Sequence, residues 1–214
     1  MNAHPQRTEF LSALTTEHFV LQTANSSTYA EASARSTLYV MALSSSLVAM
    51  GFLAGSGNLL VPFAATVLPT IFLLGLFTVV RLVETALESM HYLQGIARIR
   101  GYYRTLGPDA GWHFSARNGR WPELESPAER LGPVLAFFGT TASMIAVINN
   151  AVGGACVALL VHTLLVHTLG LAVSLWMCAV CGAATAGLLT LLFFLYQRWR
   201  FEDFEDSKGM LKQE

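Results

Sequence analysis

The chain has 214 residues, of which 53% are hydrophobic and 13% are charged, and its formal net charge is −1. Ordinary soluble domains carry about 25% charged residues, so this composition argues against a conventional water-soluble domain. The net charge by itself points neither toward nor away from nucleic acid, and nothing else in the sequence makes nucleic acid an expected partner.

Two long stretches contain no Asp, Glu, Lys or Arg: Ser36 to Val80, with 45 residues, and Leu131 to Gln197, with 67 residues. A membrane-spanning helix requires about 20 largely apolar residues. Each stretch is therefore long enough for a helical hairpin in a lipid bilayer. The sequence predicts an all-α integral membrane protein, a four-helix transmembrane bundle of two helical hairpins with a cytoplasmic helical stalk.

Residues 1–36 are expected to form a cytoplasmic helical lead-in that is weakly ordered over its first nine residues. The polar stretch Asn25–Thr28 is expected to interrupt the lead-in helix, and one long helix through this stretch is the alternative. The first span is placed at about residues 37–53. Gly55 to Asn58 has the composition of a turn.

The second span is placed at about residues 59–80. Pro69 removes a backbone hydrogen bond and is expected to kink it, and Gly75 is expected to add slack. Residues 81–133 form the stalk and a loop, and the stalk is expected to end near Leu106–Pro108. The stalk is predicted to be amphipathic because apolar residues recur among charged ones at helical spacing. These apolar residues are Leu82, Leu87, Met90, Leu93, Ile96 and Ile99.

The second hairpin is placed at residues 134–196. A capped helix start at Ser126–Glu129 leads into a third span at about 134–161. An outer turn at His162–Gly170 and a fourth span at about 171–196 follow. Residues 197–214 are a charged cytoplasmic tail, expected to be mobile past Asp206.

Four spans place both termini and residues 81–130 on one side of the membrane, together with all 13 Lys and Arg residues. The positive-inside rule makes that side cytoplasmic. The expected location is therefore the cell membrane, with a multi-pass topology and cytoplasmic termini. Five spans are the alternative, and they require a turn at Asn149–Gly154.

Asn149 and Asn150 are amides inside an otherwise apolar span. An unpaired amide in hydrocarbon costs several kcal/mol, so both are expected to bond across helices, with Ser44–Ser46 of the first span as candidate partners. The structural interpretation is helix packing. The functional interpretation is a polar pore lining or gate.

Small residues recur at every fourth position in three of the spans. Such stripes allow close helix approach in lipid. They either pack within one bundle or face another copy of the chain, which would make the protein a homo-oligomer. The stripes are Gly51 and Gly55, then Ala142, Ala146, Asn150, Gly154 and Ala158, then Ala179, Ala183 and Gly187.

A basic and aromatic cluster lies at the far end of the stalk and in the following loop. It begins about 20 residues beyond the span, or about 30 Å along a straight helix, which is far for lipid headgroups. It suits a phosphate-bearing ligand, for which arginine is well shaped, or a protein partner. A solvated helix face with a docked loop is the alternative. The cluster contains Arg98, Arg100, Tyr102, Tyr103, Arg104, Arg117, Arg120 and Trp121.

No motif of known catalytic chemistry is present: there is no P-loop, no Gly-x-Ser-x-Gly and no His-Glu-x-x-His. We therefore expect no enzyme activity, no catalytic residues, no cofactor and no metal. The pair Cys178 and Cys181 has the spacing of a redox or metal motif, but it lies in an apolar helix and is expected to be filler.

The lead-in with Ala30, Ala32, Ala34 and Arg35, the tight two-span hairpin and the charged stalk resemble small bacterial multi-span membrane proteins of unknown function. More loosely, they resemble membrane effectors of nucleotide-signalled antiphage systems. The resemblance is architectural and covers about residues 16–106. It implies that a signal sensed on the cytoplasmic face changes assembly in the membrane.

The functional prediction is a non-enzymatic multi-pass membrane protein that oligomerises and responds to a cytoplasmic ligand or protein partner. A membrane-perturbing effector is one version of it. The alternatives are a passive channel or transporter subunit with Asn149 and Asn150 on its pathway, and a membrane tether for a cytosolic partner.

Overall fold

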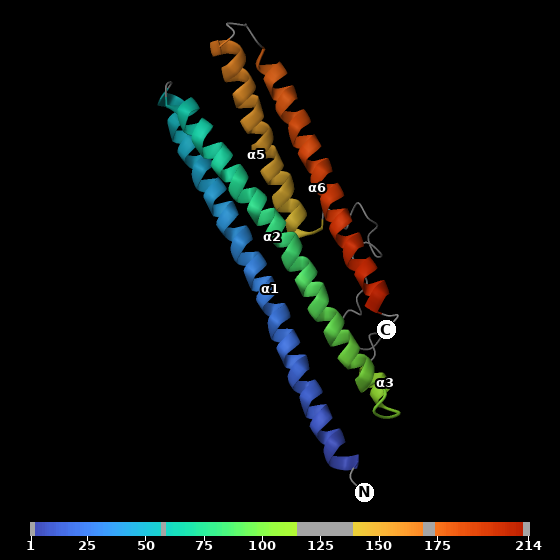
Figure 1. Ribbon diagram of the computed structural model, residues 1–214. Coiled ribbons are helices and arrows are strands. Elements are labelled where there is room, and N and C mark those ends of the chain that lie inside the picture. The colour runs from blue at the N-terminus through green and yellow to red at the C-terminus, as the bar shows by residue number, and fades with distance from the viewer. Residues whose placement is uncertain (1–2, 57–58, 115–138, 169–173, 212–214) are drawn as a thin grey trace. The chain divides into compact units, whose positions relative to one another are not determined.

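A computed structural model describes residues 3–56, 59–114, 139–168 and 174–211, and these residues form helices and turns without a strand (Figure 1). The elements in chain order are α1 (Ala3–Leu53), the 3-10 helix η1 (Ala54–Ser56), α2 (Leu60–Tyr103), α3 (Ala110–His113), α5 (Thr141–Thr163), the π-helical η2 (Leu164–Thr168) and α6 (Leu175–Leu211).

Four helical stretches of the described chain are long and apolar enough to cross a membrane: Arg7–Ser56, Leu60–Tyr103, Thr141–Val166 and Leu175–Phe204. The expected all-α class with four apolar helices is therefore confirmed for the described residues. Helix α5 is unbroken across Asn149–Gly154. The turn that a fifth span requires is absent, and the five-span alternative is wrong.

Helix α1 runs without a break through Asn25–Thr28, so the expected interruption is wrong and the single long helix is correct. The hydroxyl of Thr28 donates to the backbone carbonyl of Asn25 over 2.7 Å, and the hydroxyl of Thr23 donates to that of Phe19 over 2.9 Å. The two threonine hydroxyls thus bond to carbonyls of their own helix and leave the helix unbroken. The helix also begins at Ala3, where weak order was expected.

The chain divides into two compact units. The stalk unit contains Met1–Ala32 and Glu84–Ala136, and the bundle unit contains Ser33–Val83 and Phe137–Glu214. Helices α1 and α2 each contribute one part to the stalk unit and the other part to the bundle unit.

In the stalk unit, the first part of α1 packs against the second part of α2. The hydroxyl of Ser89 donates to the side-chain oxygen of Asn25 over 2.6 Å. A Cβ on Gly95 would lie 2.8 Å from Leu21 Cδ1, which shows close approach of the two helices. The predicted apolar side of the stalk is found inside, since Leu87, Ile96 and Ile99 are buried and Met90 and Leu93 are half-buried.

In the bundle unit, α5 and α6 pack against each other in opposite directions (Figure 1). The hydroxyl oxygen of Thr140 caps α5 by accepting from the backbone N–H of Ser143 over 3.1 Å. The cap defines the start of α5 at Thr141, so the expected start of the third span near residue 134 is wrong in that Gly139 and Thr140 are not helical. The expected helix start at Ser126–Glu129 lies outside the described residues.

The ends of the second hairpin also differ from expectation. The helical path continues through η2 to Thr168, so the described part of the expected turn at His162–Gly170 is helical rather than a turn. Helix α6 runs to Leu211, through residues after Asp206 where mobility was expected. Its extension past residue 196 carries two helical ion pairs, Arg198 with Glu202 at 2.7 Å and Arg200 with Asp203 at 3.5 Å, of the kind that stabilises a helix surface.

Candidate functional site

Two amides of α5 form the buried polar centre of the bundle unit. Asn149 and Asn150 are 2% and 8% exposed. Asn149 accepts a hydrogen bond at Oδ1 from the phenol of Tyr39 on α1 over 3.2 Å. Asn150 donates from Nδ2 to the hydroxyl of Thr190 on α6 over 3.2 Å. Each amide is therefore paired with a different neighbouring helix, which lowers the cost of burying it.

The partners expected from the sequence are wrong. Ser44 and Ser45 are exposed, and the hydroxyl of Ser46 donates to the backbone carbonyl of Ala42 over 2.8 Å. A serine hydroxyl lies close to its own helix and readily bonds there. A tyrosine hydroxyl lies at the end of a long ring, so Tyr39 reaches a neighbouring helix where the serines do not.

Helix α2 meets the same centre at Gly75. A Cβ at this position would collide with the carboxamide of Asn149 and would lie 2.7 Å from Tyr39 Cε2. Gly75 therefore makes room for the Tyr39–Asn149 pair, and the expectation that it adds slack stays a prediction. We use the name amide node for Tyr39, Gly75, Asn149, Asn150 and Thr190.

A second group of polar contacts lies near the start of α5. Ser143 is fully buried, its hydroxyl lies 2.6 Å from that of Thr140, and it donates to Gln197 Oε1 on α6 over 3.4 Å. Both groups of contacts lie within the first ten residues of α5. Beyond Asn150, small residues make the contact with α6, so the polar contacts follow only part of the helix.

Helices α5 and α6 approach each other closely at Gly154 and Gly182. A Cβ on Gly154 would collide with the backbone oxygen of Gly182, and a Cβ on Gly182 would lie 2.7 Å from the backbone oxygen of Gly154 and 3.0 Å from Ala158 Cβ. The third-span stripe is thus used for packing within the chain. On α6 this stripe faces Gly182 and Ala186. These residues come one position before Ala183 and Gly187 of the expected stripe.

The other two predicted stripes are not used in this way. Ala179, Ala183 and Gly187 are exposed. Gly51 and Gly55 are exposed as well, and a Cβ at either glycine would meet nothing within 4 Å. The described contacts of the chain therefore leave both stripes uncovered.

Arginines mark one end of the bundle unit. Arg35 is four residues from Tyr39, Arg81 is six residues from Gly75, and Arg198 is eight residues from Thr190. At the rise of an α-helix these separations are about 6, 9 and 12 Å. In the other direction, α1 to Leu53, α2 back to Leu60 and α6 back to Leu175 contain no charged residue. The amide node therefore lies nearer the charged end of these helices.

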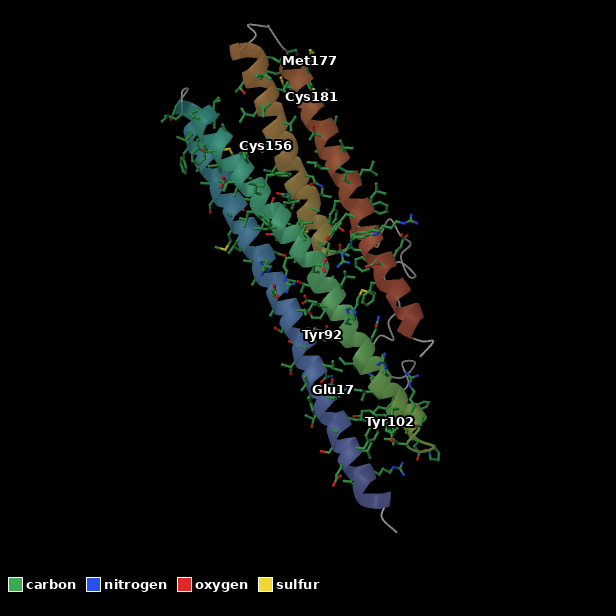
Figure 2. The ribbon with its side chains drawn as sticks, in the orientation of Figure 1. Glu17, Tyr92, Tyr102, Cys156, Met177 and Cys181 are labelled. Atoms are coloured by element: carbon green, nitrogen blue, oxygen red, sulfur yellow. The ribbon has the colours of Figure 1, made fainter. Side chains whose placement is uncertain are left out.

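In the stalk unit, Tyr103 and Arg104 hold the turn around α3 against the end of α2. The Tyr103 ring lies 5.3 Å from that of Phe114, and Arg104 Nε donates to the Phe114 carbonyl over 2.9 Å. Tyr102, near the end of α2 (Figure 2), makes an edge contact at 5.3 Å with Phe10 of α1. This arrangement matches the docked-loop alternative for these residues.

Two further residues of the predicted cluster are described. Arg98 is exposed and Arg100 is half-buried. Arg117, Arg120 and Trp121 lie outside the described residues, so a converging set of arginine forks for a phosphate group stays a prediction.

Two buried polar atoms of the stalk unit have no hydrogen-bond partner among the described residues: His18 Nδ1 and Gln94 Nε2. The His18 ring lies 6.4 Å from that of Tyr103. Burial and, to a smaller extent, the positive charge of Arg100 lower the pKa of His18. Sequence reasoning missed both residues. A signal was present, because His18 stands between Leu14 and Leu21 at the spacing of a packed helix face.

Comparison of the chain with protein-family models, with curated proteins and with solved structures finds no match in any of the three. The resemblance to membrane effectors accordingly stays a prediction.

Proposed function

We propose that this is a multi-pass membrane protein, with its stalk unit and both termini in the cytoplasm, that works without chemistry of its own. A ligand or protein partner received by the stalk unit changes how the bundle unit packs, and through it how copies assemble in the membrane. The observation that carries this proposal is the continuity of α1 and α2. Each is one unbroken helix that belongs to both units.

The continuity supports transmission because neither helix has a break near the unit boundaries at Ala32–Ser33 and Val83–Glu84. An unbroken helix gives a shift of its backbone a continuous hydrogen-bonded path from one side of a boundary to the other. Small helix shifts of this kind are one of the known structural routes of switching.

The polar contacts support the stalk unit as the part that rearranges. Its helix interface contains the unpartnered His18 Nδ1 and Gln94 Nε2, whereas both amides of the node have partners on other helices. Unsatisfied polar atoms make an interface less stable, and the least stable contacts of a fold are the ones that open first.

The charge distribution supports the orientation. The arginines nearest the amide node stand at one end of the bundle unit, and the positive-inside rule assigns that end to the cytoplasm. A passive channel has less support. Asn149 is hydrogen-bonded to Tyr39, Asn150 is hydrogen-bonded to Thr190, and the described polar contacts cover only part of α5.

A stalk lock tests the proposal. Leu21→Cys with Gly95→Cys, in a chain whose three native cysteines are replaced, joins α1 and α2 where they touch in the stalk unit. In cell membranes we expect oxidation of this pair to change the distribution of oligomers on native gels and the membrane potential reported by a dye. Reduction should reverse both changes.

The control is the same lock with two glycines inserted between Ala32 and Ser33 and two more between Val83 and Glu84. These insertions interrupt the helices and should cancel the effect of the lock. A lock without effect contradicts the proposal, and so does an effect that survives the insertions unchanged.

A further inference from the structure

One face of α6 is apolar and is left exposed by the described residues of the chain. Between Leu175 and Gln197 the helix has no charged residue. Its large exposed side chains are all more than half exposed, which is the reverse of the pattern on a helix that packs in water. They are Leu175, Trp176, Met177, Val180, Leu188, Leu191, Leu192, Leu195 and Trp199 (Met177 and Cys181 mark part of this helix in Figure 2).

Two polar side chains of the same helix face inward. Thr190 bonds to Asn150, Gln197 accepts from Ser143, and Gln197 is only 8% exposed. Helix α6 therefore has a hydrogen-bonded inner side and a hydrocarbon outer side, so the surroundings of its outer side must be apolar.

The two tryptophans stand at the ends of this face. Trp176 is 80% exposed, Trp199 is 59% exposed, and they are 23 residues apart. That separation is about 35 Å along an α-helix. The hydrocarbon core of a bilayer is about 30 Å thick, and the bilayer with its headgroup regions about 40–45 Å. Two indoles at this distance fit the two interfaces of one bilayer, where tryptophan is enriched.

The Trp199 end carries the other features of a cytoplasmic interface. The ring of Tyr196 lies 6.5 Å from that of Trp199, and Arg200 Cζ lies 5.9 Å from the Trp199 ring centroid. The charged part of α6 begins at Arg198. Aromatic rings and arginines together at the end of an uncharged helix are typical of a headgroup boundary.

We infer that the outer face of α6 lies directly against lipid acyl chains, with Trp176 and Trp199 at the opposite headgroup boundaries. This inference rests on the membrane location in the proposed function and names the partner of one surface. A second copy of the chain is the competing occupant. The large side chains of this face disfavour it, because helices in lipid associate through small residues that let the backbones approach.

The placement of the two tryptophans at the headgroup boundaries also sets how deep the amide node lies in the bilayer. Thr190 is 14 residues from Trp176 and nine from Trp199, or about 21 Å and 14 Å along the helix. With the indoles at the interfaces, the Asn150–Thr190 hydrogen bond forms inside the hydrocarbon core, where no water competes for either group.

Fluorescence of single tryptophans in vesicles tests the inference. All four tryptophans are replaced by Phe, and then Trp176 alone, Trp199 alone or Leu188→Trp is introduced into the full-length chain. Each protein is reconstituted in phosphatidylcholine vesicles whose acyl chains carry bromine near the headgroup or near the chain end. We expect chain-end bromine to remove most of the Leu188→Trp emission. Headgroup-proximal bromine should quench Trp176 and Trp199 more strongly than chain-end bromine does.

Phe193→Trp is the matched control, since Phe193 is 9% exposed on the same helix and should be protected from the bromines. If Leu188→Trp does not fold, Leu191→Trp replaces it as the outer probe. An outer probe that neither bromine nor aqueous acrylamide quenches is covered by protein, which overturns the inference and leaves the membrane location intact. An outer probe quenched by acrylamide alone overturns both. The two proposals can fail separately. If the bromines quench as expected but the stalk lock has no effect, the lipid contact of α6 stands and the proposed transmission from the stalk unit fails.

Discussion

The phenol of Tyr39 donates to the side-chain oxygen of Asn149 over 3.2 Å, and the two residues are 110 positions apart in the chain. One of them belongs to the first hairpin and the other to the second. Between them α2 approaches at Gly75, where only a hydrogen fits. The bundle unit therefore has one point where three of its helices depend on one another, and substitutions there have definite expected outcomes.

Tyr39→Phe removes the donor and keeps the ring. Asn149 Oδ1 then loses its only described partner on another helix, and interhelical hydrogen bonds in membrane proteins contribute roughly 0.5–2 kcal/mol. We expect a lower unfolding midpoint of the purified protein in detergent, followed by circular dichroism. Tyr29→Phe is the control, because Tyr29 is 61% exposed. Equal midpoints for the two variants would show that the hydrogen bond contributes nothing.

Gly75→Ala places a methyl group where Asn149 and Tyr39 lie. Overpacking of this kind costs about 1–3 kcal/mol, so the variant should unfold at a lower detergent or denaturant concentration. Gly51→Ala is the matched control, since a Cβ there meets nothing within 4 Å. The control should be neutral or slightly more stable, because alanine favours a helix over glycine. The same loss in both variants would contradict the contact.

Gly182→Ala and Gly187→Ala separate packing from helix propensity on one helix. The first methyl would lie 2.7 Å from the backbone oxygen of Gly154, and the second meets nothing within 4 Å. We expect Gly182→Ala to separate α5 from α6 and lower the midpoint, and Gly187→Ala to leave it unchanged or raise it slightly. A reversed order would mean that the exposed stripe with Gly187, and not Gly182, makes the important contact.

His18 should make the stalk unit sensitive to acid. Its pKa is lowered in the folded chain, first by burial and then by Arg100, so the unfolded chain binds the proton more readily. The contribution of neutral His18 to the free energy of unfolding is therefore fully present above the ordinary pKa of 6.5. It is lost as the pH falls below 6.5 toward the pKa of the folded chain. On α2, the charged and titratable groups that face His18 are Arg100 and Tyr103.

His18→Gln cannot titrate, so between about pH 8 and pH 5 its protease resistance in the stalk unit should fall less than that of the wild type. Limited proteolysis of the protein in detergent measures this difference. His113→Gln is the control because His113 is exposed on α3. A wild-type pH profile retained by His18→Gln would remove His18 as the cause.

The sequence was sufficient for those features that follow from single helices. Two blocks without charge predict four apolar helices, because no water-exposed hairpin tolerates stretches of that length and composition. The apolar spacing of Leu87, Ile96 and Ile99 predicts which side of the stalk is buried, because that pattern belongs to α2 alone.

The features that depend on the relative register of two helices could not be predicted from the sequence. Asn149 was expected to need a partner, but its choice of Tyr39 over Ser44–Ser46 depends on how α1 faces α5. The choice of Gly182 over Ala183 depends in the same way on the rotation of α6. The start of α5 at Thr141 is different, because the pair Thr140 and Ser143 has the spacing of a cap and is visible in the sequence, where the signal at Ser126–Glu129 is stronger.

The separation of the bonded partners along the chain sets an order for their synthesis. Asn150 and Thr190 are 40 residues apart, and a ribosome adds about 5–20 residues per second. Asn150 leaves the ribosome about 2–8 s before the hydroxyl that will bind it, and Tyr39 precedes Asn149 by about 6–22 s. During that interval the tyrosine hydroxyl of the nascent chain has no Asn149 to bind, so the contact between the two halves of the bundle unit can form only after Asn149 has been synthesised.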